Sequence, residues 1–330
     1  MAAPHDDDWS RSGVAGILAP RFAPGDSRMK LRNLLAAAAG LACAGCALID
    51  GREVGADGVA EGLLEWRDVR AQAQPEKVPP LSYGTARHQV GELRLPPGVE
   101  GPFPVLVLIP GPCWEGDGSY LRPLAASLAT LGVATWTIDY RAAGQGESWT
   151  DAALDVARAT DHLRVLAQTW PLDLRRVAVA GHGGGGQLAL WLAARGRIAK
   201  GDALYLRDPL PPRAVIGLAA ITDLDAVRAD AQAGCSGMLD RLLDGAPDTA
   251  AAQLSPARLL PLRTPQWLVQ GALDHRVAAD AASRYAEQAR RKGDRVTIGV
   301  TSNAGHWEPV VPGSATWMTL QQAVVAALLQ

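Results

Sequence analysis

The sequence has almost no net charge, no histidine cluster and no internal repeat. Its formal net charge is −2 over 330 residues, so no charge excess points to a nucleic acid or to an anionic membrane as a partner. The six histidines are scattered, and no two have the spacing of a metal site. We therefore expect neither a metal nor a cofactor. The composition, 48% hydrophobic and 20% charged, is ordinary for a folded globular protein with a large core.

Residues 29–46 have the order of an export signal. Met29 is a second plausible start, followed by two basic residues, an apolar run too short to span a bilayer, and small residues before Cys46. The segment resembles a bacterial lipoprotein signal with lipid attached at Cys46. That predicts a periplasmic or membrane-anchored protein that touches the membrane through the lipid alone. Cys43 stands where the pattern usually has leucine. A buried Ala-rich helix is the alternative for this segment, and residues 1–28 are interpreted as a disordered extension or a misassigned start.

From residue 81 to residue 330 the sequence predicts one α/β domain. Short apolar runs alternate with longer segments of helical periodicity, which is typical of a mostly parallel sheet with helices on both faces. The expected strands are 82–86, 89–95, 103–109, 133–138, 176–180, 214–218, 266–270 and 295–300. The expected helices are 120–131, 150–169, 187–195, 278–292 and 314–329. Residues 47–80 are expected to be a tether, and residues 221–262 a small lid inserted over the edge where the strands end.

A run of glycines lies between an expected buried strand and an expected helix, at residues 181–186. A strand, a tight turn and a helix in this order form the nucleophile elbow G-x-S-x-G of α/β hydrolases. Small residues must flank the nucleophile there, and helix N–H groups favour a developing negative charge. Gly181 and Gly185 occupy the two glycine positions, and Gly183 stands where the serine would be. The nucleophile is therefore missing, and a glycine there would also allow the strained elbow to relax.

Two later loops carry the other members of a catalytic triad. Asp274 follows one expected strand, and His306 follows the next. A carboxylate in the first position would orient and charge-stabilise a histidine acting as general base. The order nucleophile, acid, base along the chain is the order of this fold. We predict that Asp274 and His306 are a retained acid and base beside the vacant position Gly183.

From about residue 81 onward the chain resembles exported α/β-hydrolase esterases, in the branch that also resembles kynurenine formamidases. The resembling segments include LVLIPGPCW, VAVAGHGGGGQLALWLAAR, VQGALDHRV and AGHWEPVVP, in the family's order. The resemblance implies the α/β-hydrolase fold and the roles given above to the acid and the base. The family's elbow reads like G-H-S-A-G-G, and its oxyanion loop reads like H-G-G-x-W. In this chain that loop contains Pro112, which has no N–H to donate, so we expect one oxyanion donor to be lost and the N–H of Gly184 to remain.

Several residues beside the expected site have more than one interpretation. Cys113 is a substitute nucleophile, a disulfide partner of Cys235, or one of two buried free thiols. Trp114 and Trp307 are either walls of a ligand pocket or core residues. His182 is either catalytic or packs beside the pocket. The sequence alone does not choose among these roles.

The glycine run also fits the dinucleotide-binding pattern G-x-G-x-x-G, at residues 181, 183 and 186. Three observations oppose that interpretation. The run does not open the sheet, no acidic residue ends a strand about 20 residues further on, and the loops of Asp274 and His306 would have no role. A P-loop is excluded because no Lys-Ser or Lys-Thr follows the glycines.

Three functions remain open at this point. The first is a non-hydrolytic or very weakly active relative of carboxylesterases that binds a small ester-like or aromatic ligand between lid and sheet. The second is a hydrolase in which His306, oriented by Asp274, activates water directly. The third is a structural protein of the cell envelope. Nothing in the sequence indicates an oligomeric state.

Overall fold

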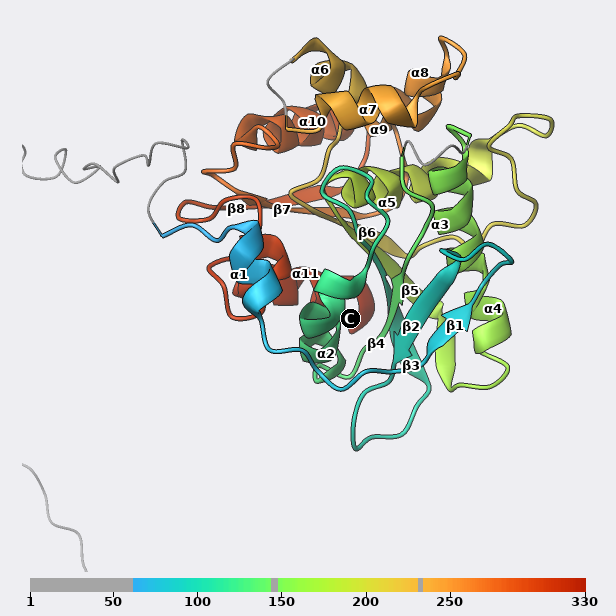
Figure 1. Cartoon of the computed structure of the whole chain (residues 1–330), viewed down its shortest axis with the longest axis vertical. Helices are drawn as coiled ribbons and strands as arrows, with labels where there is room; N and C mark the ends of the chain where they lie inside the picture. The colour runs from blue at the N-terminus through green and yellow to red at the C-terminus, as the bar shows by residue number, and fades with distance from the viewer. Residues whose placement is uncertain (1–61, 144–147, 231–233) are drawn as a thin grey trace, which may run out of the picture. The chain divides into compact units, whose positions relative to one another are not determined.

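Eight strands form a single sheet in the part of the chain that the computed structural model describes, residues 62–143, 148–230 and 234–330. The strands are β1 (Pro80–Ser82), β2 (Val90–Arg94), β3 (Phe103–Ile109), β4 (Ala134–Ile138), β5 (Leu172–His182), β6 (Ala214–Leu218), β7 (Gln266–Gly271) and β8 (Val296–Thr301). Their order across the sheet is β1-β2-β4-β3-β5-β6-β7-β8. The pairs β1–β2 and β2–β4 are antiparallel and the other pairs are parallel. The prediction of a mostly parallel sheet is confirmed (Figure 1).

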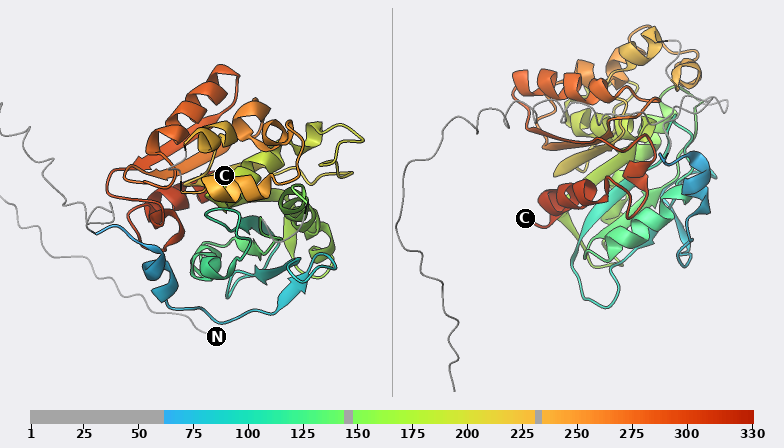
Figure 2. Two further views of the ribbon diagram at one scale, coloured as in Figure 1. Left: turned by 45° about the horizontal axis from the view of Figure 1, so that its top comes forward. Right: turned by 90° about the vertical axis from the view of Figure 1, so that its left-hand side faces the viewer.

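Helices cover both faces of the sheet (Figure 1, Figure 2). One face carries α2 (Arg122–Ala129) and α11 (Trp317–Leu328), and the other carries α3 (Asp151–Asp161), α5 (Gly184–Ala194) and α10 (Ala279–Arg291). The shorter helices are α1 (Trp66–Ala71), α4 (Leu163–Leu166), α6 (Leu224–Ala229), α7 (Ser236–Leu242), α8 (Ala250–Leu254) and α9 (Pro256–Leu259). Single 3₁₀ turns lie at Ser119–Leu121, Arg195–Arg197 and Glu308–Val310. The fold is that of the α/β hydrolases, as predicted.

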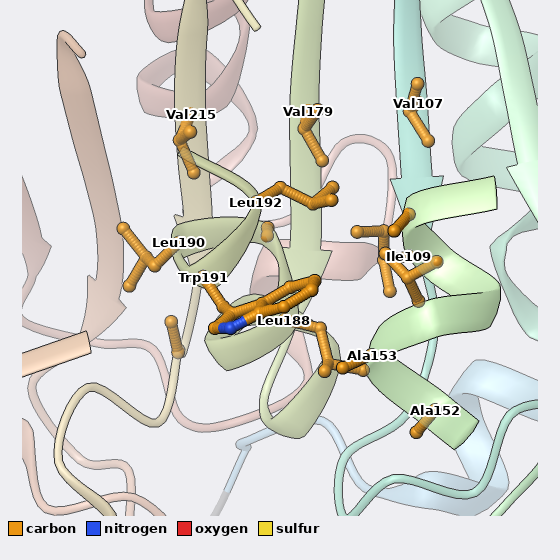
Figure 3. Close-up of a cluster of buried hydrophobic side chains, with 14 of the residues drawn as sticks. Val107, Ile109, Ala152, Ala153, Val179, Leu188, Leu190, Trp191, Leu192 and Val215 are labelled. Carbon is orange, nitrogen blue, oxygen red and sulfur yellow. The ribbon is translucent and has the colours of Figure 1, made fainter. Parts of the chain in front are cut away.

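The central strand β3 is buried along its whole length. Because successive side chains of a strand point to opposite faces, β3 contributes to two separate cores. Val107 and Ile109 pack toward α3 and α5, and Leu106 and Leu108 pack toward α2 and α11. Figure 3 shows the first of these cores, where Trp191 of α5 lies among the side chains of the neighbouring strands. Burial on both faces explains why the strand is a continuous apolar run.

The loops that matter for function leave one edge of the sheet. They follow β3, β5, β7 and β8, which are parallel, so all four strands end on the same side. The expected lid, residues 221–262, is helical, with α6 to α9 near one another at the top of Figure 1. These elements place the predicted acid, base and nucleophile positions close together.

Three sequence predictions differ from the structure. The expected strand 82–86 is wrong, because β1 ends at Ser82 and the chain then turns, closed by Tyr83 N–H donating to the carbonyl of Gln89. The expected helix 150–169 is two helices, α3 and α4, separated at His162. Helical periodicity continues across that break, so the pattern does not reveal it.

The expected tether, residues 47–80, contains a packed segment at residues 62–71, whereas residues 73–79 form neither helix nor strand. Residues 62–71 include α1, whose Val69 is fully buried in the core, and Leu63, which is buried just before the helix. Because few apolar residues make this contact, the sequence of the segment looks polar and does not reveal that it packs. The export signal, Cys46 and the rest of residues 1–61 lie outside the described residues. All described residues belong to one compact unit, Glu53–Gln330, and none of their helices is both long and apolar enough to cross a membrane.

Candidate active site

The nucleophile elbow keeps its shape without a nucleophile. β5 ends at His182 and α5 begins at Gly184, so Gly183 alone makes the turn, with φ +55° and ψ −115°. This is a region that residues with a side chain rarely adopt. The expectation that glycine relaxes the elbow is therefore wrong. The N–H of Gly183 donates to the carbonyl of Leu218 at 3.0 Å, and its carbonyl accepts from Ile221 at 3.0 Å, so the surrounding chain holds the turn.

The backbone of Pro112 fills the space where a side chain at position 183 would begin. A Cβ placed on Gly183 would be 2.8 Å from Cα of Pro112 and closer still to the Pro112 carbonyl oxygen. That oxygen accepts a hydrogen bond of 2.9 Å from the N–H of Gly184. The next N–H, of Gly185, donates to the carbonyl of Gly111 at 3.0 Å. The expectation that Gly184 remains a free oxyanion donor is wrong, because Pro112 already occupies it.

The acid and the base meet as predicted. Nδ1 of His306 lies 2.9 Å from Oδ2 of Asp274, and both side chains are buried. The backbone N–H groups of Arg276 and Val277 donate to the other oxygen of Asp274 at 2.8 and 2.9 Å. Burial alone would raise the pKa of Asp274, but the charge of His306 and these hydrogen bonds outweigh it and hold the pKa below its ordinary value. Asp274 is thus an ionised acceptor that orients the imidazole.

The outer nitrogen of the base has nothing to bind within the described structure. Nε2 of His306 is buried and has no hydrogen-bond partner among the described residues. In a Ser-His-Asp site this atom takes the proton of the serine, and here Gly183 offers no hydroxyl. A buried polar atom without a partner is unfavourable by about 1–3 kcal/mol. Asp274 and His306 thus form a hydrogen-bonded pair, and no hydroxyl among the described residues binds the free ring nitrogen.

His182 is a structural residue. Its Nε2 lies 3.0 Å from the carbonyl of His306, and its Nδ1 lies 3.1 Å from the hydroxyl of Tyr120. The Tyr120 hydroxyl in turn accepts from the N–H of Gly111 at 3.0 Å. These contacts assign the proton to Nε2 and let Nδ1 accept from tyrosine. Burial, together with the charge of His306, lowers the pKa of His182 to about 3, so the ring is neutral and fully bonded.

The two tryptophans expected near the pocket are core residues. Trp114 is fully buried, and its Nε1 donates to Oε1 of Gln187 at 2.8 Å. Trp307 is 6% exposed and packs against the rings of Trp66 and His182, with centroid separations of 5.0 and 5.2 Å. Neither indole lines the cleft described below.

Cys113 and Cys235 are joined in a disulfide, with their Cα atoms 5.2 Å apart. This confirms the disulfide interpretation and excludes both the free thiols and the substitute nucleophile at Cys113. The bond links the loop after β3, which holds Pro112 over the elbow, to the residue that caps α7 in the lid. The loop that closes the site is therefore covalently attached.

A cleft of about 750 Å³ lies between the lid and α10. It is lined by both apolar and charged side chains, and Asp274 is the one triad position among the described residues that line it. Its other walls include Ile221, Asp223, Val227, Arg276, Val277 and Tyr285. The cleft adjoins the acid side of the dyad, and its volume is that of a small-molecule site.

Two features of the site were missed by sequence reasoning. Arg276, two residues after the acid, places its guanidinium carbon 5.6 Å from the ring centre of Trp307, and its proximity to Asp274 in the sequence could have marked it. Glu308 accepts hydrogen bonds of 2.8 Å from the N–H of Leu64 and from that of Gly305. This buried carboxylate ties the N-terminal segment to the loop of the base, a contact that no local pattern predicts.

Comparison with known proteins places the chain among esterase-like hydrolases. The family model described as BD-FAE matches residues 92–288. A crystal structure of an inhibited esterase B from Lactobacillus rhamnosis is 19% identical, with 78% of this chain and 90% of that chain covered and a TM-score of 0.65. A thermophilic esterase from Thermogutta terrifontis is 18% identical, with 76% and 91% covered and a TM-score of 0.60.

A third similar structure is an acetyl ester-xyloside bifunctional hydrolase from Caldicellulosiruptor lactoaceticus. It is 17% identical, with 79% of this chain and 93% of that chain covered and a TM-score of 0.59. At these identities the structural likenesses show the fold. A search of curated proteins found no match.

Proposed function

Because the chain belongs to the BD-FAE family of esterase-like α/β hydrolases, we propose that it is a non-hydrolytic member that binds a small ligand in the cleft beside its retained dyad. One observation carries this proposal. The carbonyl of Pro112 accepts from the N–H of Gly184 and lies where a side chain of residue 183 would begin. This contact leaves little room for a side chain at position 183 and occupies the N–H of Gly184, which supports a non-hydrolytic role.

Losing the nucleophile and a free oxyanion donor together would reduce turnover strongly. Removing the nucleophile from a Ser-His-Asp triad reduces turnover by about 10⁶. Occupying one oxyanion donor removes a further factor of roughly 10²–10³. Acyl transfer needs a nucleophile, a base and an oxyanion site together, and of these only the base remains. The cleft next to the dyad is open and supports a binding role.

A second candidate function is direct activation of water by the dyad. The observation that favours it is the unpartnered Nε2 of His306, on the ring whose Nδ1 binds the ionised Asp274. A water at that nitrogen would be activated as in general-base catalysis. Without a free oxyanion donor at Gly184, such a reaction would lack the stabilisation that tetrahedral intermediates require, and we therefore place it second.

We also propose that the protein is exported and anchored through lipid at Cys46, since residues 29–46 have the order of a lipoprotein signal. The disulfide between Cys113 and Cys235 supports this proposal, because such bonds persist mainly in oxidising compartments.

The proposed function is tested by mass spectrometry and by ligand binding on the same sample. We expect a serine-directed phosphonate to leave the intact mass unchanged, and small esters or amides to raise the melting temperature without being consumed. A stoichiometric phosphonate adduct would overturn the proposal. A panel of esters, amides and thioesters that leaves the melting temperature unchanged would favour a structural role in the envelope.

A further inference from the structure

Arg276 stands in the cleft wall with an incompletely satisfied guanidinium. Its backbone N–H binds Asp274, and its side chain lies over the indole of Trp307. The Nε atom is buried and has no hydrogen-bond partner among the described residues. A guanidinium stacked on an aromatic ring keeps its in-plane N–H groups available for a planar acceptor. The guanidinium of Arg276 can therefore bind an anionic acceptor that the described residues do not supply.

The other arginines of the cleft are already paired. Arg284 forms an ion pair with Asp280, and Arg291 forms one with Glu287 at 3.7 Å. Arg276 makes no ion pair with any residue in the described ranges. Arg276 is half-buried, and its buried Nε N–H has no acceptor among the described residues. A donor in that position is unfavourable without an acceptor, which a negatively charged ligand would supply.

The acidic residues of the cleft do not supply that charge. Asp274 is engaged by His306 and two backbone N–H groups, and Asp223 accepts from the N–H of Asp225 at 3.0 Å. Asp230 has an interaction of its own. Their negative charges are thus directed to other partners, and none lies within ion-pair distance of Arg276 among the described residues.

The first turn of α10 lies in the same wall, and its one acidic residue, Asp280, is ion-paired with Arg284. The helix begins at Ala279, and its N-cap, Ala278, provides no side-chain cap. Ala278 and Ala281 both line the cleft. An uncapped helix N-terminus offers free N–H groups and the positive end of the helix dipole. Arg276 and this terminus therefore favour an anion at one end of the cleft.

One part of the wall is apolar and includes Ile221, Val227, Ala257 and Val277, while Asp223, Asp230 and Glu287 are among the charged residues that line the remainder. We infer, resting on the non-hydrolytic binding role proposed above, that the cleft binds a small carboxylic acid with an aromatic or aliphatic tail. The carboxylate pairs with the guanidinium of Arg276, whose fork matches its two oxygens, and the tail lies against the apolar wall.

The test compares an acid with its neutral isostere on the full chain with its disulfide formed. Calorimetry with phenylacetate and phenylacetamide should show the acid binding about 10- to 100-fold more tightly. Arg276→Gln should remove this preference, and Arg276→Lys should retain only part of it. Arg258→Gln serves as the matched control, because Arg258 is exposed, paired with Asp225 and outside the cleft. It should bind phenylacetate as the wild type does.

Equal affinity of the wild type for acid and amide, or no binding of phenylacetate at millimolar concentration, would overturn the inference. So would an Arg276→Gln variant that melts like the wild type and keeps the preference for the acid. If Arg276→Gln fails to fold, Arg276→Lys decides, and an undiminished preference for the acid in that variant counts against the site. Hydrolysis of methyl phenylacetate is followed in parallel, since turnover would contradict the non-hydrolytic role and leave the carboxylate site standing.

Discussion

At the scale of single residues, the glycine at position 183 and the carbonyl of Pro112 explain one another. A Cβ at 183 would overlap Pro112, so the loop can lie where it does only because residue 183 has none. The same carbonyl satisfies the N–H of Gly184, which a working esterase would keep for its substrate. The two departures from the family pattern, at the elbow and in the oxyanion loop, are therefore parts of one contact.

Restoring the serine alone is predicted to harm the protein without restoring activity. Gly183→Ser places a side chain at a positive φ and against Pro112, and strain and overpacking together should lower the free energy of unfolding by about 2–4 kcal/mol. Ester hydrolysis should stay at background because Gly184 remains occupied. Gly196→Ser is the control, since a Cβ there meets no atom within 4 Å. A Gly183→Ser variant as stable as this control would show that the loop yields easily.

Asp139 gives a prediction on pH dependence. Burial raises the pKa of Asp139 to about 6, despite a hydrogen bond from the N–H of Gly118. A carboxyl whose pKa is raised in the folded state contributes stability that is lost as the pH rises from about 4 through 6. Asp139→Asn does not titrate, so its stability relative to the wild type should increase over that window by about 1–2 kcal/mol, allowing for partial exposure. Urea unfolding at pH 4 and pH 7 measures this, and an equal difference at both values would contradict it.

At the scale of elements, the proposed function depends most on the loop after β3. Its residues bind the elbow through Gly111 and Pro112, and the next residue, Cys113, is bonded to Cys235 at the start of α7. The sheet positions this loop, and the disulfide attaches it to the lid. Movement that would free the N–H of Gly184 must therefore involve the lid as well.

Removing the disulfide is predicted to destabilise the domain. The bond spans 122 positions of sequence, and disulfides that close loops of this length contribute about 2–5 kcal/mol. The double variant Cys113→Ser, Cys235→Ser should lose that much in unfolding free energy. Adding a reductant should lower the stability of the wild type equally and leave the double variant unchanged. Insensitivity of the wild type to reductant under unfolding conditions would mean that the bond is not formed.

The sequence predicted the elements of the site better than their contacts. Asp274 and His306 could be placed because each follows an apolar strand, and parallel strands bring their ends together. The role of Pro112 could not be predicted, because it depends on a backbone carbonyl and on a contact between loops about 70 residues apart. Arg276 and α1 were not predicted for a related reason. An unpaired cation and a short amphipathic helix are recognised only from contacts with residues distant in the sequence.

At the scale of the whole molecule, the N-terminal segment is part of the domain. α1 packs Trp66 against Trp307, and Glu308 binds the N–H of Leu64 as well as that of Gly305. The described part of the N-terminal segment thus contacts the loop that carries His306.

Lipid attachment at Cys46 is tested by metabolic labelling with a fatty acid in a bacterial host. We expect label on the wild-type chain and none on Cys46→Ser, because the cysteine thiol is the acceptor in a lipoprotein signal. Cys43→Ser is the control and should be labelled as the wild type is. An unlabelled wild type, or label that persists on Cys46→Ser, contradicts the anchor.

The central claim is that a hydrolase fold has closed its own catalytic site while keeping its acid and base. The measurement that tests it most directly is the hydrolysis of p-nitrophenyl acetate by the purified wild type and by His306→Ala. We expect both proteins to hydrolyse the ester at the same rate, within error of the uncatalysed reaction. Turnover by the wild type that is well above this background and is lost in His306→Ala would contradict it and would establish the dyad as a working base.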